Sequence, residues 1–255
     1  MRAFALPAAV ILSLCLYMPM PGLKEKPESL FARLHSGVQA VLQNKQIAAR
    51  RAFPITLALL ILAAALLSAV HPLLCAVITA PLFTFSAVMP GCAKAKDELD
   101  SGRYARDIPA YEAIVRENCL SLAPAFAHGF YAPLLLLTLG LPMRLGAALA
   151  YAYAVLCALE GRDERARRPL AAIRRAADKV FSAMLMLCAG LVGRNPLRIR
   201  AANAQERLIR TLGIAGDRSD THAPMAGDIA QGIFVCGFAA GLLCLMLTLV
   251  LMAVC

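Results

Sequence analysis

Long apolar segments alternate with short charged segments along the whole chain. A helix needs ~20 mostly apolar residues to cross ~30 Å of hydrocarbon, and several segments approach that length. The apolar segments cover residues 4–20, 53–70, 72–90, 129–159 and 229–254. This pattern predicts an all-α fold in one domain, residues 1–255. We expect a polytopic membrane helix bundle with about 4–6 membrane helices, one of them broken, and amphipathic cytoplasmic helices.

Two of the apolar stretches are interrupted by residues that end helices. His71 followed by Pro72 predicts a tight turn between two antiparallel helices, with His71 at a membrane surface. The Gly140-Leu141-Pro142 sequence breaks the stretch 129–159 into either one kinked span or two half-helices that meet within the membrane. Membranes tolerate a broken helix where its backbone faces protein or a water-filled cavity, so this stretch is a candidate wall of a site.

The polar segments between these stretches predict further helices. Residues 24–51 have the apolar spacing of an amphipathic helix that lies on the membrane surface or packs under the bundle. Two short charged helices are expected at about 93–101 and 108–122, and another helix over 198–212. Residues 181–192 are apolar but short, which favours a re-entrant or bundle-core helix.

The charge distribution sets the expected orientation. The segments 24–51, 160–179 and 194–218 are rich in Arg and Lys. Because short cytoplasmic loops carry an excess of Lys and Arg, we expect all three segments on the cytoplasmic face of the cell (inner) membrane. The formal net charge of +10 is therefore attributed to membrane flanks. No basic run interleaved with aromatic residues indicates a nucleic-acid partner.

The composition supports a membrane protein. Hydrophobic residues make up 60% of the 255 residues and charged residues 16%, with a mean hydropathy of +0.67 and no Trp. A soluble domain has nearer ~45–50% and ~25%. These values exclude a disordered chain, a collagen-like chain and a small disulfide scaffold. The nine cysteines contain no C-x-x-C pair, so we expect neither a zinc nor an iron–sulfur site, and no required disulfide.

Three sequence features could carry chemistry, although no phosphate loop, H-E-x-x-H motif or serine elbow is present. His128-Gly129 opens a membrane helix, where free N–H groups would favour an anion, or else forms a surface turn. The segment 163–178 concentrates arginines, which either bind phosphate or anchor the chain at the membrane. Asp228 stands before the last span, at a capping position.

Read in order, these features resemble the membrane-bound CobD/CbiB family of cobalamin biosynthesis, the adenosylcobinamide-phosphate synthases. The family segment E-S-x-A-E-N-x-x-D-G-x-x-A-P-L-F is similar to residues 120–134, without a gap. The family's N-E-R-Y-R-D and R-L-D-D are similar to 163–168 and 175–178, and A-A-M-A-G-A-L-G to 223–230. A front motif, H-P-V-R-L-I-G-R-L-I, is echoed by 26–34.

The chain departs from the family at several polar positions. Where the first motif has acidic and amide groups, this sequence has Leu120, Pro124, Ala125 and His128. One aspartate of the R-L-D-D motif is replaced by Ala177, and the opening histidine of the front motif by Lys26. Mg²⁺ prefers carboxylate oxygens, and neither Pro nor Ala offers one.

The resemblance implies a function in cobalamin (vitamin B12) biosynthesis: the ATP-dependent amide ligation of an aminopropanol phosphate to adenosylcobyric acid. ATP and Mg²⁺ are the implied cofactors. The implied partners are the corrinoid and aminopropanol phosphate substrates, the lipid bilayer and membrane proteins of the same pathway. A wide cavity open to the cytoplasm is expected between residues 129–159 and 160–179.

The resemblance also implies roles for particular residues. Phosphate would be bound by Arg165, Arg168, Arg175 and Gly129. Glu164 and Asp178 would hold a metal or the amine, and His128 would be a replacement polar group.

Two other hypotheses remain open. In the first, the chain is a catalytically degenerate membrane relative, an AmpE-like sensor or partner protein, which predicts a cavity that is dry or free of carboxylates. A small transporter or unrelated bundle is ranked last, because the apolar segments carry almost no polar residues at mid-depth.

Overall fold

The computed structural model describes residues 4–19, 25–44, 52–102, 104, 107–143, 145–161, 164–192, 199, 201–214 and 223–254. These residues form helices and no strand. The α-helices are α1 (Ala5–Tyr17), α2 (Glu25–Asn44), α3 (Ala52–Val70), α4 (Pro72–Thr79), α5 (Met89–Asp100), α6 (Ile108–Phe126), α7 (Ala132–Gly140), α8 (Gly146–Leu159), α9 (Glu164–Cys188), α10 (Ala204–Leu212) and α11 (Ala226–Val254).

Two helices are long and apolar enough to cross a membrane: Ile108–Gly140 and Ala226–Ala253. A third span results if Leu74–Leu82 and Thr84–Asp100, bent by 42°, count as one. The all-α class and a membrane bundle with two or three candidate spans are therefore found in the described residues. The expected number of about 4–6 membrane helices is not reached among the described residues. Helices α1 and α8 and the Pro54–Leu66 part of α3 are apolar but shorter than a span requires.

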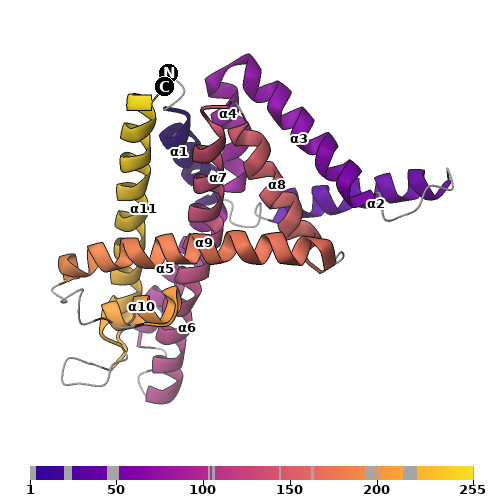
Figure 1. Cartoon of the computed structure of the whole chain (residues 1–255). Helices are drawn as coiled ribbons and strands as arrows, with labels where there is room; N and C mark the ends of the chain where they lie inside the picture. Colours follow the sequence, from indigo (N-terminus) through magenta and orange to yellow (C-terminus); the bar gives the residue numbers. More distant parts are fainter. Residues whose placement is uncertain are drawn as a thin grey trace.

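The apolar and charged helices occupy opposite ends of the molecule. Helices α1, α3, α4, α7 and α8 contain no Asp, Glu, Lys or Arg. In Figure 1 they lie above α9, together with most of α11, whereas α10, α6 and the charged part of α5 lie below it. The amphipathic helix α2, expected from residues 24–51, and α9 both run crosswise to α11, at the boundary between the two ends (Figure 1). The described fold thus separates an apolar slab from a charged end.

The His128-Gly129 step is not a helix start, and this expectation was wrong. Helix α6 begins at Asp107, whose side chain accepts a hydrogen bond from the Ala110 N–H at 3.1 Å. It then continues past 122, through a π-helical turn at Ala127–Tyr131, into α7. Pro133 lacks the amide hydrogen that an α-helix would direct at the Gly129 carbonyl, and the π turn stands directly before it. The N–H groups near Gly129 therefore belong to the helix interior.

The other predicted breaks are confirmed. Helix α3 ends at Val70 and α4 begins at Pro72, which leaves His71 exposed between them. After Gly140 the chain turns, and α8 packs back along α7 as a helical hairpin. A Cβ on Gly140 would stand 2.5 Å from the Gly146 nitrogen, so glycine is needed where the two helices meet.

The carboxyl-terminal helices match expectation in part. Residues 181–188 form the end of the long helix α9, with 189–192 a 3₁₀ turn, and not a separate re-entrant helix. The buried apolar stripe of α9 runs without a break from Leu170 through Phe181 to Cys188. Because the stripe is continuous, residues 164–180 and 181–188 form one helix. The last span α11 lies where it was predicted, whereas α10 begins at Ala204, six residues later than the expected start at 198. The described cysteines are free thiols.

Candidate functional site

A cavity of about 480 Å³ lies where α2, α6, α8 and α9 meet. One part of its wall is apolar and includes Phe31, Leu82 and Val88. The polar part of the wall is formed by His128, Tyr153, Glu160 and Arg174, with the small side chains of Ser121 and Thr84 beside them. The cavity lies partly where the resemblance implies one, between α8 and α9.

The π turn shapes the inner wall of this cavity. It places Gly129 against the 3₁₀ segment Thr84–Val88 so closely that a Cβ would stand 2.7 Å from Thr84 Oγ1 and 2.8 Å from the Phe85 nitrogen. The hydroxyl of Tyr153 donates a 3.1 Å hydrogen bond to the His128 carbonyl, which fastens α8 to the turn. Aromatic rings of Phe85, Phe126 and Phe130 fill the space behind it, with ring centroids 4.9 and 5.2 Å apart. Such turns are frequent at functional sites.

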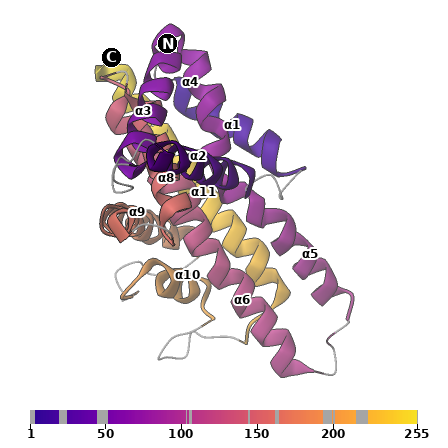
Figure 2. The ribbon, with the colours of Figure 1, turned by 90° about the vertical axis from the view of Figure 1, so that its right-hand side faces the viewer.

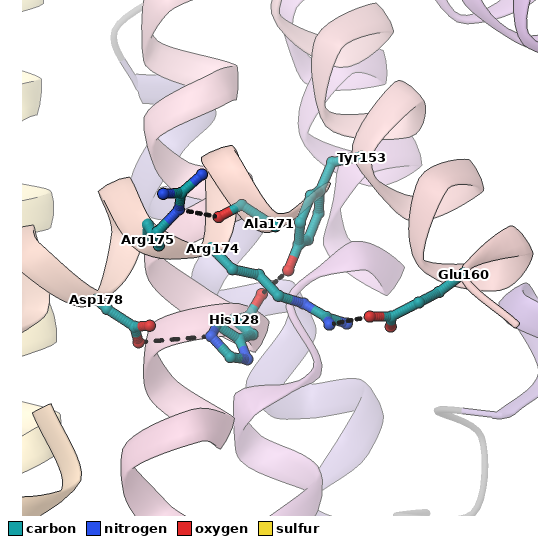
Figure 3. A network of polar contacts seen from close by, with 7 residues as sticks. All are labelled: His128, Tyr153, Glu160, Ala171, Arg174, Arg175 and Asp178. Carbon is teal, nitrogen blue, oxygen red and sulfur yellow. Dashed lines mark hydrogen bonds and ion pairs between the residues drawn. The ribbon is translucent and has the colours of Figure 1, made fainter. Parts of the chain in front are cut away.

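One ion pair and one histidine–carboxylate contact lie at the polar end of the cavity (Figure 3). Arg174 Nη1 donates a 2.7 Å hydrogen bond to Glu160 Oε1, and His128 Nε2 lies 3.4 Å from Asp178 Oδ1. Partial burial opposes the charged form of Arg174, but the hydrogen bond to Glu160 and the electrostatic attraction of its neighbours together raise the pKa of the guanidinium. Arg174 is therefore a permanent cation in the wall, and Glu160 stands beside it.

Two buried nitrogen atoms in this cluster have hydrogen-bonding capacity left over. Arg174 Nε has no hydrogen-bond partner among the described residues. The contact of His128 Nε2 with Asp178 is longer than a normal hydrogen bond, and this nitrogen is also unsatisfied. A ligand with a hydrogen-bond acceptor would satisfy Arg174 Nε, since buried polar groups are rarely left unpaired.

The structure separates the predicted site residues into two sets. His128 and Gly129 line the cavity, and Asp178 contacts His128. Glu164, Arg165, Arg168 and Arg175, in contrast, are exposed on α9 and do not line it. Arg175 Nε donates to the Ala171 carbonyl at 3.1 Å, turned away from the His128–Asp178 pair (Figure 3).

This placement corrects the expectation that these arginines face the cavity. Neighbouring residues on a helix point about 100° apart, so only one of two adjacent arginines can face the bundle. That residue is Arg174. Asp163 lies outside the described residues.

Sequence reasoning missed three residues of the cavity wall: Tyr153, Glu160 and Arg174. Glu160 was detectable in principle as the first charge after a long apolar stretch. Arg174 could have been identified from the apolar stripe of α9, because it borders that stripe and Arg175 does not. Nothing in the sequence distinguished Tyr153 from Tyr151.

The donor set does not fit a bound Mg²⁺–ATP. Within the described part of the chain, no group of three or more His, Cys, Asp or Glu side chains could hold a metal ion. The carboxylate in the cavity wall, Glu160, is already paired with Arg174. Mg²⁺ is usually bound through carboxylates together with phosphates, so no step through this cofactor is derived for these residues.

Comparisons with known proteins give no match: no protein-family model, no curated protein and no solved structure is significantly similar to this chain.

Proposed function

We propose that this protein is a catalytically degenerate membrane relative of the CobD/CbiB family, a sensor or partner protein of the AmpE-like kind. It would bind a small ligand in the cavity beneath α9. It resides in the cell (inner) membrane, with about 4–6 membrane helices when the shorter apolar helices are included. The charged end faces the cytoplasm, since the basic segments belong on that side.

One observation carries this proposal. Pro124, Ala125 and His128 stand in the cavity wall. In the resemblance to the family, these are the positions of an acidic residue, an amide and a second acidic residue. The wall is thus located where the family's motif would put its polar groups, but Pro and Ala cannot hold a metal or an ammonium group. This combination favours a retained cavity with lost ligation chemistry.

The cavity indicates what kind of ligand would bind. Its volume of about 480 Å³ is typical of sites for drug-sized molecules. An adenosylated corrinoid is larger than the molecules that such a cavity encloses. Arg174 and Glu160 together present both signs of charge at one end, and the opposite wall is apolar. A neutral or zwitterionic polar head on a short apolar body would fit this arrangement.

Complementation tests the proposal. The full chain is expressed in a bacterial strain that lacks the synthase, grown where cobalamin must be made from cobyric acid. We expect no rescue, although immunoblotting finds the protein in the membrane fraction. A genuine synthase expressed from the same vector is the positive control. Rescue by the unmodified chain would overturn the proposal.

The second candidate is the synthase reaction itself, the ATP-dependent joining of aminopropanol phosphate to adenosylcobyric acid. It is favoured by the convergence of His128, Asp178, Glu160 and Arg174 at one end of the cavity. It predicts rescue that Arg174→Ala and Asp178→Ala abolish. Arg175→Ala is the matched control, because Arg175 is adjacent in sequence but outside the cavity.

A further inference from the structure

Basic side chains follow one line along the outer face of α9. Arg168, Arg175 and Lys179 are separated by seven and four residues, a spacing that places them on the same side of a helix. All three are exposed. The opposite side of α9, with Leu170, Phe181 and its other buried residues, packs into the bundle. The line of cations is therefore directed away from the protein.

The position of α9 along the last span places this line at a membrane surface. Helix α9 packs against α11, and the Cys188 side chain lies near Cys236. The last helix contains no charged residue from Ile229 to Val254, so Cys236 lies seven residues inside the uncharged stretch. The part from Cys236 to Val254 is about 28 Å long at 1.5 Å per residue, close to the ~30 Å thickness of the hydrocarbon core. Helix α9 thus crosses α11 about one hydrocarbon thickness from the carboxyl end of that helix (Figure 1).

The hairpin of α7 and α8 indicates the same position for the membrane surface. Helices α7 and α8 contain no charged residue, and the first charged side chain after α8 is Glu160, which pairs with Arg174 of α9. Figure 2 shows α9 nearly end-on, beside the bundle and between α8 above and α10 below. The apolar hairpin of α7 and α8 therefore ends at the level of α9.

We propose that α9 docks on the headgroups of anionic lipids through Arg168, Arg175 and Lys179. Arginine forms paired hydrogen bonds with phosphate, and basic side chains near an anionic membrane surface are attracted to its headgroups. The hydrogen bond from Arg175 Nε to the Ala171 carbonyl orients the Arg175 side chain. This bond leaves the two terminal nitrogens of the guanidinium for other acceptors. The proposal does not depend on the function of the cavity.

The acidic residues of α9 do not cancel this line of charge. Asp178 contacts His128 on the cavity side of the helix. Glu164 is exposed but stands at the first turn, one end of the line. The centre of the outer face, around Ala172, is bordered by cations alone: Arg168, Arg175 and Lys179.

The test uses the full chain reconstituted in phosphatidylcholine vesicles that contain spin-labelled phosphatidylglycerol or spin-labelled phosphatidylcholine. The measured quantity is the association constant of the anionic lipid relative to the neutral one. We expect a preference for phosphatidylglycerol that falls several-fold in the triple variant Arg168→Gln, Arg175→Gln, Lys179→Gln. It should also weaken in high salt, because the Debye length shortens from ~10 Å at 0.1 M to ~3 Å at 1 M.

The matched control removes three charges at the other end of the molecule. Lys94, Lys96 and Arg116 lie on α5 and α6, and their triple change to Gln should leave the lipid preference unaltered. Circular dichroism checks that both variants keep their helix content. Inorganic phosphate is compared with sodium chloride at the same ionic strength to separate the two sources of phosphate. If phosphate abolishes the lipid preference and chloride at that ionic strength does not, the proposal is overturned. A preference that survives in the α9 variant, or that the control variant loses equally, would also overturn it.

Discussion

Replacing Gly129 with alanine tests the packing that builds the inner wall of the cavity. The new Cβ would stand 2.7 Å from Thr84 Oγ1 and 2.8 Å from the backbone nitrogen of Phe85. Both distances are well inside van der Waals contact, and the second neighbour is main chain that no rotamer change can move. The 3₁₀ segment must therefore shift away from the π turn.

Two opposing effects determine how much Gly129→Ala changes the free energy of unfolding. Overpacking of a well-packed core costs typically ~1–3 kcal/mol. Alanine in place of glycine in a helix gains up to ~1 kcal/mol of backbone stability. The net expectation is a loss of about 1–2 kcal/mol, which lowers the Tm of a chain of this size by about 2–8 °C. Thr84→Ala added to Gly129→Ala should recover only part of the loss, because the Phe85 nitrogen remains in place.

Buried thiols provide the assay. Cys92, Cys119 and Cys236 are buried, so a maleimide dye that fluoresces on reaction reports unfolding of the detergent-purified protein during a temperature ramp. Gly237→Ala on α11 is the matched control, since a Cβ there would meet nothing within 4 Å. Its Tm should be unchanged or slightly higher. If Gly129→Ala unfolds at the same temperature as Gly237→Ala, the close approach of the π turn to the 3₁₀ segment is refuted.

Three further predictions concern polar contacts. A double-mutant cycle of Arg174→Ala and Glu160→Ala, followed by thermal unfolding, should give a coupling of about 0.5–1 kcal/mol, because the pair is partly exposed; additive effects would contradict the ion pair. The Ala202 N–H donates to Glu206 at 2.7 Å and lowers the pKa of that carboxyl, so its contribution to α10 is complete above the ordinary carboxyl pKa and is lost as pH falls through the lowered value. Hydrogen exchange of α10, corrected for intrinsic rates, should accelerate on acidification in the unmodified protein but not in Glu206→Gln. Asn203→Ala removes the cap that accepts from the Glu206 N–H and should destabilise α10 by about 1 kcal/mol in the same experiment, whereas unchanged protection would exclude that cap.

Where local chemistry decides the fold, the sequence was sufficient. The His71-Pro72 pair ends one helix and begins the next, as its composition requires. The amphipathic helix α2 and the long apolar helix α11 were predictable in the same way, because apolar periodicity and length are properties of the segment alone. These features needed no knowledge of neighbouring helices.

Where tertiary contacts decide, the sequence was not sufficient. Gly129 looked like the start of a helix, but it lies inside a continuous helix, within the π turn. Its lack of a side chain allows close contact with Thr84, which belongs to a distant segment of the chain. Arg174 and Arg175 are identical as side chains, and only the packing of α9 decides which of them reaches the cavity. Matching to a family's spacing could not make that distinction.

We propose that α9 lies at the membrane surface, about 28 Å from the carboxyl end of α11. Spin labels at the exposed positions Ala172, Phe238, Leu245 and Met252 of the vesicle-reconstituted protein measure depth through their relative accessibility to oxygen and to a nickel chelate. We predict a shallow label at Ala172 and at Phe238, the greatest depth at Leu245, and a return toward the surface at Met252. A label at Ala172 as deep as that at Leu245, or uniform access of the nickel chelate along α11, would contradict the account.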